Sequence, residues 1–375
     1  MASAPDQQLR AAIRLHRYTV ARHWTGHELV GPDPGIRFNY RMGRFIKSYL
    51  PQVRWRDDYY YLQGQGYWTL SNWRLFDLLG GERYRDIAVR CSASMLAAQR
   101  PDGAWSYPNP EWSGRVATVE GSWGSIGLLE TYRHTGESSF LTGALRWHRF
   151  LIESVGFQRI GDTLAANYFA HCRGVRVPAN SSIVLRFLAE LADVTGDQAY
   201  LAQTGGLMRF FRSTQLASGE FPYAVEGAVE RRRLHFQCYQ YNAFLCLDLI
   251  RYFELTGNTD SLELVTRVLG FLVNGVAEDG HGFYACGNAR RAVTYHAAAL
   301  GAAVSAGAGL GVTSDDLAKR AYAYVMLRQR PDGGFPYSEG DYRLLSDRRS
   351  YPRYLAMILL HLLRPGPVPP IRTLS

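Results

Sequence analysis

The feature that most constrains this fold is a nine-residue pattern that occurs three times. The copies begin at Gln99, Gln215 and Gln329, and they share the skeleton Q-x-x-x-G-x-[WF]-x-Y. A weaker relative of the pattern begins at Glu278. Self-similarity of this kind indicates repeated supersecondary units, because each unit buries its apolar face only against its neighbours.

A second recurring feature is an apolar helical segment that ends in Thr-Gly, at Gly136, Gly196 and Gly257. Glycine just past the last apolar position is typical of a helix C-terminus. Successive Thr-Gly pairs lie about 60 residues apart, which fits a two-helix repeat with a long connecting loop.

Apolar residues at helical spacing predict two alternating series of helices. The first helix of each unit is expected near residues 66–79, 119–134, 181–195, 240–256, 293–308 and 350–363. The second helix is expected near residues 83–99, 138–155, 198–213, 259–274 and 314–328, with residues 7–25 as the missing sixth partner. We therefore expect residues 1–375 to form one all-α domain, with residues 365–375 as an irregular tail. The N-terminal helix would pack against the last helix and close the ring of hairpins.

This repeat resembles two related superfamilies. One is the six-hairpin (α/α)6 toroid of glycosidases, polysaccharide lyases and uronyl C5-epimerases. The other is the toroid of terpenoid cyclases and protein prenyltransferases, whose repeats also use Q-x-x-x-G-x-W. The resemblance spans about residues 59 to 363 and implies an (α/α)6 toroid, a fold that by itself implies no single activity. Residues 63–66, Gln-Gly-Gln-Gly, and 241–244, Tyr-Asn-Ala-Phe, also resemble segments of glucuronyl C5-epimerases, which favours carbohydrate chemistry.

Arginine supplies almost all of the basic charge behind the net charge of +9, because the only lysines are Lys47 and Lys319. Many of the arginines fall in predicted loops: Arg231, Arg232, Arg233, Arg290, Arg291, Arg343, Arg348, Arg349 and Arg353. The planar guanidinium group binds carboxylate, sulfate or phosphate, so this placement favours an anionic ligand. We expect no nucleic-acid binding, because the chain has no known motif for it and the arginines do not form a stripe.

Several other classes of protein are disfavoured by what the sequence lacks. No uncharged apolar run reaches about 18 residues, so no membrane span is expected. The first residues lack the apolar core of a signal peptide, and we expect a cytoplasmic protein. The five cysteines include no CxxC pair, which fits a reducing compartment better than a disulfide framework. Cys172, Cys238 and Cys286 leave zinc as an open alternative, but their spacing is not standard, and we predict no metal and no cofactor.

The loops that enter the first helices should gather at one mouth of the ring, where a rigid scaffold usually carries its site. The predicted catalytic residues begin three successive units: His235, Tyr295, His296 and Tyr351. Positive helix ends there should favour an anionic substrate and lower the pKa of a tyrosine. The predicted substrate-binding residues are Trp105, Tyr107, Trp112, Arg115, Arg173, Tyr241, Asn242, Arg291, Arg349 and Arg353. For each residue alone, buried packing or hydrogen bonding is the competing interpretation, above all for the repeat aromatics Trp105, Phe221 and Phe335.

These residues predict an enzyme that acts on an acidic, uronate-containing oligo- or polysaccharide by β-elimination or C5 epimerisation, without a redox cofactor. A glycoside hydrolase on the same fold would need two facing carboxylates, and spacing singles out no such pair. A terpenoid or prenyl cyclase would need an Asp-rich motif, for which Asp57-Asp58 is the better candidate. A non-catalytic glycan-binding protein of an exopolysaccharide system is the remaining alternative.

Overall fold

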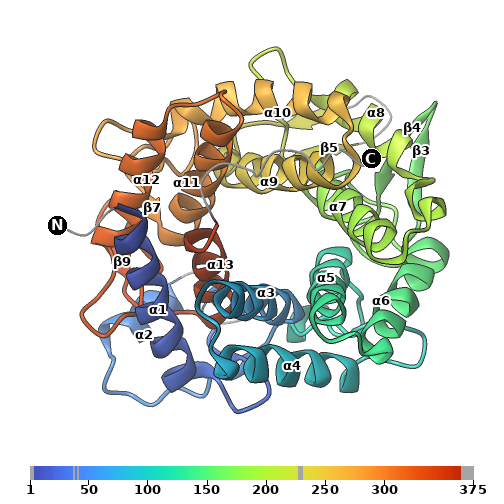
Figure 1. Cartoon of the computed structure of the whole chain (residues 1–375). Coiled ribbons are helices and arrows are strands. Elements are labelled where there is room, and N and C mark those ends of the chain that lie inside the picture. The colour runs from blue at the N-terminus through green and yellow to red at the C-terminus, as the bar shows by residue number, and fades with distance from the viewer. Residues whose placement is uncertain (1–3, 37–38, 40–41, 227–230, 365–375) are drawn as a thin grey trace.

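Two concentric layers of helices form the molecule, an (α/α)6 toroid (Figure 1). The computed structural model describes residues 4–36, 39, 42–226 and 231–364. The inner helices are α3 (Leu62–Leu79), α5 (Thr118–Thr135), α7 (Pro178–Thr195), α9 (Cys238–Thr256), α11 (Thr294–Gly309) and α13 (Pro352–Leu362). The outer helices are α1 (Ala4–His23), α4 (Glu82–Ala97), α6 (Ser138–Phe150), α8 (Thr204–Thr214), α10 (Thr259–Leu272) and α12 (Asp315–Leu327). The predicted fold class and both helix series are confirmed, while the predicted tail 365–375 lies outside the described residues.

The toroid is closed by its first helix, as predicted. Helix α1 packs against α13, and α13 packs against α3, so the two ends of the repeat meet (Figure 1). Two side-chain bonds fix this closure. Gln8 Nε2 donates to the carbonyl of Leu362 at 2.7 Å, and Gln329 Nε2 donates to the carbonyl of Ala11 at 2.9 Å.

The three Gln-Gly-aromatic turns fasten outer helix α4 to α6, α8 to α10 and α12 to α1. The glutamine side chain of each turn donates both to the turn glycine and to the following outer helix: Gln99 to the carbonyls of Gly103 and Gly143, Gln215 to those of Gly219 and Leu264, and Gln329 to those of Gly333 and Ala11. The aromatic residue of each turn is buried. The repeat therefore fixes contacts between outer helices. This explains why the repeat predicts the fold and does not predict a reaction.

Short antiparallel strands, which the sequence did not predict, shape the loops that lead into the inner helices. Helix α2 (Gly43–Tyr49) lies in the N-terminal one of these loops. The pairs are β1 (Val30–Gly31) with β2 (Tyr59–Tyr60), β3 (Phe157–Ile160) with β4 (Thr163–Ala166), and β5 (Ala224–Glu226) with β6 (Arg231–Arg233). A three-stranded sheet joins β7 (Ala292–Val293), β8 (Ser338–Asp341) and β9 (Leu345–Asp347). The β7–β8 pairing ties two neighbouring loops together at one end of the toroid, and each of the other pairs forms within one loop.

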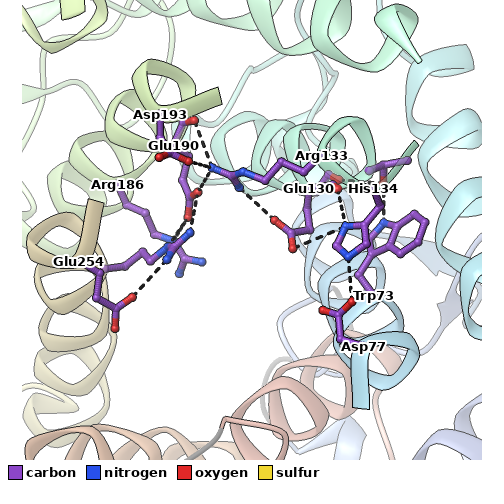
Figure 2. A network of polar contacts seen from close by, with 12 residues as sticks. Trp73, Asp77, Glu130, Arg133, His134, Arg186, Glu190, Asp193 and Glu254 are labelled. Atoms are coloured by element: carbon purple, nitrogen blue, oxygen red, sulfur yellow. Dashed lines mark hydrogen bonds and ion pairs between the residues drawn. The ribbon is translucent and has the colours of Figure 1, made fainter. Parts of the chain in front are cut away.

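The opposite end, where the inner helices finish, holds a network of ion pairs (Figure 2). Glu190 of α7 is buried and contacts three guanidinium groups, with Arg133 Nη2 at 2.7 Å, Arg251 Nε at 2.8 Å and Arg186 Nε at 3.6 Å. His134 of α5 stacks on Trp73 of α3, so the network joins successive inner helices. In the described part of the chain, no helix is long and apolar enough to cross a membrane.

Candidate functional site

Tyrosine side chains line the mouth of the toroid, the end at which the inner helices begin. Their rings contact one another around it, with centroid separations of 6.2 Å for Tyr61–Tyr107, 4.8 Å for Tyr223–Tyr241, 4.2 Å for Tyr295–Tyr354 and 5.3 Å for Tyr337–Tyr354. The guanidinium of Arg353 bridges two of them, 3.9 Å from the Tyr61 ring and 4.6 Å from the Tyr354 ring. Flat rings with polar edges suit the binding of sugars.

Glu120, in the first turn of α5, is the carboxyl group at this mouth with the most unusual surroundings. Its side chain is 2% exposed. One oxygen, Oε2, accepts the backbone N–H of Gln63 at 2.8 Å at the start of α3, while Oε1 is buried without a hydrogen-bond partner among the described residues. Burial raises the pKa of Glu120 to about 7, although Arg353 opposes the shift. A carboxyl of this kind both gives and takes protons near neutral pH.

Asp33 and Arg353 form a buried ion pair beside Glu120. Arg353 Nη2 lies 2.8 Å from Asp33 Oδ2 and donates to the hydroxyl of Tyr354 at 2.6 Å. Burial raises the pKa of Asp33, although Arg353 opposes this shift too. The group therefore combines two carboxyls with one guanidinium, whose Nε has no hydrogen-bond partner among the described residues.

Neither carboxyl was among the predicted site residues, although the sequence places Glu120 directly after the aromatic loop 100–118. Glu120 stands where a helix cap is expected, and Asp33 lies in a stretch without any predicted element. Only the tertiary structure brings them to the same arginine, and no local pattern signals that approach. Glu120 lies in the first turn of α5, a position typical of a helix-capping carboxylate, but the helix N-terminus that it contacts is that of α3.

Two further predicted arginines are also ion-paired. Arg291 Nε lies 2.7 Å from Asp341 Oδ1, and Arg349 Nη2 lies 2.9 Å from Asp57 Oδ2, which Lys47 contacts as well. Aspartates thus balance much of the positive charge on this side of the mouth. Burial raises the pKa of the nearby Asp347 to about 6.

Three of the four predicted catalytic residues gather on one side of the mouth. Tyr295 and Tyr351 both contact Tyr337, with ring centroids 6.1 and 5.1 Å apart, and they line one small pocket. His296 contacts Tyr295 at 4.4 Å, and burial lowers its pKa well below the usual value. The fourth, His235, lies elsewhere, with Nδ1 2.9 Å from Glu220 Oε2.

The expected effect of the helix ends on these tyrosines is wrong in sign. Burial raises the pKa of Tyr295 and of Tyr351 well above the ordinary value. The hydroxyl of Tyr351 also donates to Asp347 Oδ2 at 2.6 Å. The loss of water around a buried phenolate therefore outweighs the partial positive charge of a helix N-terminus, which is worth about 1 kcal/mol.

The predicted binding residues divide between exposed and structural positions. Tyr107 and Trp112 stack with centroids 5.6 Å apart, and Arg115 lies 5.2 Å from the Phe169 ring, so the loop 100–118 presents an aromatic platform. Trp112 is 40% exposed and is accessible to a ligand. Arg173 is exposed in a separate loop, and Tyr241 is half-buried against Tyr223.

Trp105 and Asn242, in contrast, are held by backbone contacts. Trp105 is buried, and its indole Nε1 donates to the carbonyl of Met95 at 2.8 Å. Asn242 accepts the N–H of Phe221 and donates to its carbonyl, and thereby fastens the repeat turn to α9. For these two residues the structure agrees with the competing packing interpretation.

The mouth also brings together a group of metal-ligand side chains. Ligand atoms of His235, Cys238 and Cys286 all lie within 4.8 Å of one another. Cys172, the third cysteine considered from the sequence, is exposed in a different loop.

Comparison with known proteins shows the fold alone. No family model matches the chain, and no curated protein sequence matches it. Among solved structures, a cellobiose 2-epimerase from Bacillus thermoamylovorans is similar with a TM-score of 0.72 and 14% identity, over 95% of this chain and 98% of that one. A glycosyl hydrolase family 88 protein from Bacteroides vulgatus has a TM-score of 0.66 and 10% identity, over 96% and 98% of the two chains. A polysaccharide lyase also has a TM-score of 0.66 and 10% identity, over 96% and 97%.

Proposed function

We propose that this chain is a carbohydrate-active enzyme that acts on a uronate-containing glycan by β-elimination or C5 epimerisation, with Glu120 as the proton-transfer group. The observation that carries the proposal is the buried Glu120, with one unpartnered oxygen and a pKa near 7, beside Arg353 at a tyrosine-lined mouth. The similar structures support carbohydrate chemistry in general, because they include an epimerase, a glycosyl hydrolase and a lyase.

Proton abstraction at C5 of a uronate needs a neutralised carboxylate and a positioned base. In the proposed reaction, Arg353 and the neighbouring tyrosine hydroxyls bind the uronate carboxylate, and ionised Glu120 removes the C5 proton. In elimination, the C5–H electron pair forms the C4–C5 double bond, the C4–O bond breaks, and the leaving oxygen takes a proton from a tyrosine or from water. In epimerisation, a proton instead returns to C5 on the opposite face.

Glycoside hydrolysis is a second candidate, because Asp33 supplies another carboxyl beside the same arginine. Hydrolysis requires such a pair, one member as an acid and the other as a base or nucleophile. The terpenoid cyclase alternative loses support, since its candidate acid Asp57 is held between Lys47 and Arg349.

The test is incubation of the purified protein with a panel of uronate polymers and oligosaccharides. Three readouts separate the reactions: near-ultraviolet absorbance for elimination, solvent deuterium at C5 for epimerisation, and new reducing ends without unsaturation for hydrolysis. Glu120→Gln should lower the active reaction by about a hundredfold or more, because it removes the proton-transfer group but can still accept the Gln63 N–H.

Glu82→Gln, at an exposed position where outer helix α4 begins at the end of the toroid away from the mouth, is the matched control and should retain activity. Folding of both variants is checked by circular dichroism. Full turnover in folded Glu120→Gln would refute the role of Glu120. The absence of all three products with every polymer would refute the substrate class.

A further inference from the structure

Two segments that are far apart in the sequence place an imidazole and two thiols together at the mouth. His235 lies just before α9, Cys238 is the first residue of α9, and Cys286 comes from the loop that precedes β7. The two sulfur atoms lie 3.2 Å apart as free thiols, and the ligand atoms of all three residues lie within 4.8 Å of one another. On a tetrahedral zinc ion with Zn–S bonds of about 2.3 Å, two sulfurs lie roughly 3.5–4 Å apart, so only a small adjustment is needed.

A buried carboxylate orients the histidine. Glu220 is 1% exposed, its Oε1 accepts the backbone N–H of His235 at 3.1 Å, and its Oε2 lies 2.9 Å from the ring Nδ1. With Nδ1 directed at a carboxylate, Nε2 is the ring nitrogen left for a metal. Metal-binding histidines usually have this outer partner, which fixes the ring and raises its basicity.

The backbone around the cysteines supplies a hydrogen-bond donor to one of the sulfur atoms. The N–H of Cys286 donates to Cys238 Sγ at 3.3 Å, and Cys238 is the first residue of α9, at the positive end of the helix. His235 and Gln237 adopt left-handed conformations, with φ of 56° and 45°, which non-glycine residues rarely do. Strain concentrated immediately before a possible ligand is common at functional sites.

We propose that His235, Cys238 and Cys286 bind one divalent transition-metal ion, for which Zn²⁺ is the best match, with a fourth coordination position open to solvent. Thiolate and imidazole ligands select zinc among the common cations, and two thiolates balance its charge. Three protein ligands are typical of zinc sites that keep a position for water or substrate, whereas structural sites use four. Cys286 and His235 are exposed, so the open position faces the mouth.

This site is separate from the Glu120 group. Glu120 lies on α5 and Arg353 on α13, and one inner helix, α7 or α11, stands between each of these helices and α9 (Figure 1). The metal proposal therefore does not depend on the proposed reaction, and it assigns His235 to metal binding in place of proton transfer.

The primary experiment measures metal content and coordination in untagged, reduced protein. After loading with Zn²⁺ and dialysis, we expect about one zinc per chain by mass-spectrometric metal analysis. Replacement by Co²⁺ should give intense visible bands and a sulfur-to-cobalt charge-transfer band, the signature of tetrahedral thiolate ligands. Bound zinc should also protect the exposed Cys286 from alkylation while Cys172 reacts.

Variants then assign the ligands. Cys238→Ser and Cys286→Ser should each weaken zinc binding by about a hundredfold or more, and Glu220→Gln should weaken it by about ten- to a hundredfold, the usual effect of losing an outer partner. Cys172→Ser, an exposed cysteine in another mouth loop, is the matched control and should bind normally. Circular dichroism checks folding, and the alkylation experiment needs no variant.

Three results would overturn the proposal. One is the absence of zinc binding by the reduced protein at micromolar free zinc. Another is equal binding by Cys238→Ser and the wild type, which would place the metal elsewhere. The third is a persistent Cys238–Cys286 disulfide, seen by mass spectrometry in protein purified without oxidant, that excludes the metal.

Discussion

At the scale of single residues, burial decides the charge of the mouth. It raises the pKa of Glu120 to about 7, raises the pKa of Asp33, and lowers the pKa of His296. Each shift favours the neutral form, because a charged group loses its hydration when it is buried. Arg353 remains charged, so the Glu120 group changes its net charge near neutral pH.

Glu120→Gln should therefore alter the pH dependence of stability. Folded wild-type protein holds the Glu120 proton between the ordinary pKa of 4.5 and about 7, whereas the unfolded chain releases it. The wild type consequently loses stability as pH rises through this window, by up to roughly 3 kcal/mol, and the variant does not. Urea denaturation from pH 4.5 to 8 should show that the free energy of unfolding of the variant increases relative to that of the wild type as pH rises. A difference that stays constant with pH would contradict the raised pKa.

Tyr351→Phe tests a predicted catalytic residue whose hydroxyl already has a partner. The variant leaves buried Asp347 without the Tyr351 donor, so the free energy of unfolding should fall by about 1–3 kcal/mol. Urea denaturation measures this change. Turnover per folded molecule is measured in parallel. A hundredfold loss of this turnover, in addition to the loss of stability, would support Tyr351 as a proton-transfer group. A variant with unchanged stability would show that the bond to Asp347 contributes little.

At the scale of elements, the repeated turn sets how closely the outer helices approach. No residue with a side chain can replace the glycine of the turn, because its Cβ would meet the backbone of the next outer helix. In the second turn, Gly219 has a φ of 87°, and a Cβ added to it would overlap the carbonyl group of Arg267. The Thr-Gly cap residue Gly257 also has a positive φ, 67°, but open space surrounds it.

This difference predicts that a glycine-to-alanine substitution lowers the free energy of unfolding by different amounts at the two positions. Gly257→Ala should lower the free energy of unfolding by about 1 kcal/mol, the usual cost of a left-handed alanine. Gly219→Ala should cost about 3 kcal/mol or more, because α8 and α10 must also move apart. Equal midpoints of urea denaturation for the two variants would show that the turn does not hold the outer helices at a fixed separation.

The secondary-structure elements also show how much of the structure can be predicted from the sequence. The helices were predictable because caps, apolar spacing and the Gln-Gly-aromatic turn are local signals that recur in each unit. The strand pairs at the mouth were not, because β1 with β2 and β7 with β8 are two residues long and join segments that are far apart in the sequence. The same limit explains the site: Tyr107 and Trp112 lie five residues apart and were predicted together, whereas Asp33, Glu120 and Arg353 meet only through the closed toroid.

At the scale of the whole molecule, the two ends of the toroid differ in how their buried polar groups are paired. The mouth keeps buried groups whose hydrogen bonding is incomplete, such as Glu120 Oε1 and Arg353 Nε. The opposite end instead surrounds its buried carboxylate with charge, since Arg251, Arg133 and Arg186 hold the pKa of Glu190 well below its usual range despite burial (Figure 2). One end therefore carries the proposed reactive groups, and the other surrounds a buried carboxylate with arginines.

The variant Glu190→Gln should lower the stability of the protein without changing either proposed site. The substitution leaves three arginines near a neutral amide, and breaking a buried ion pair from one side costs about 3–5 kcal/mol. We expect that loss in urea denaturation at pH 7. Turnover and zinc content per folded molecule should not change, because Glu190 lies at the end of the toroid away from both proposed sites. A selective loss of either property would show that the two ends are coupled.

Closure by the N-terminal helix is the last feature that concerns the whole molecule. Helix α1 covers α13 and fills the sixth outer position, with Leu15 and Ala12 fully buried. Without it, the apolar faces of α13 and α12 would be exposed, and the first and last hairpins would lose their connection. A toroid differs from an open repeat array in this respect, since the first and last units of an open array make no contact with each other.

Deletion of residues 1–23 should therefore abolish cooperative unfolding of the whole chain and not merely lower its midpoint. Circular dichroism, binding of a hydrophobic dye and limited proteolysis would measure the loss, with Gln329→Ala as a mild version that removes only the bonds to Ala11 and Gly333. A synthetic peptide of residues 4–23 added in excess should restore part of the lost protection, because α1 supplies contacts and no chemistry. A truncated protein that unfolds as cooperatively as the full chain would show that the remaining hairpins form a stable ring without α1.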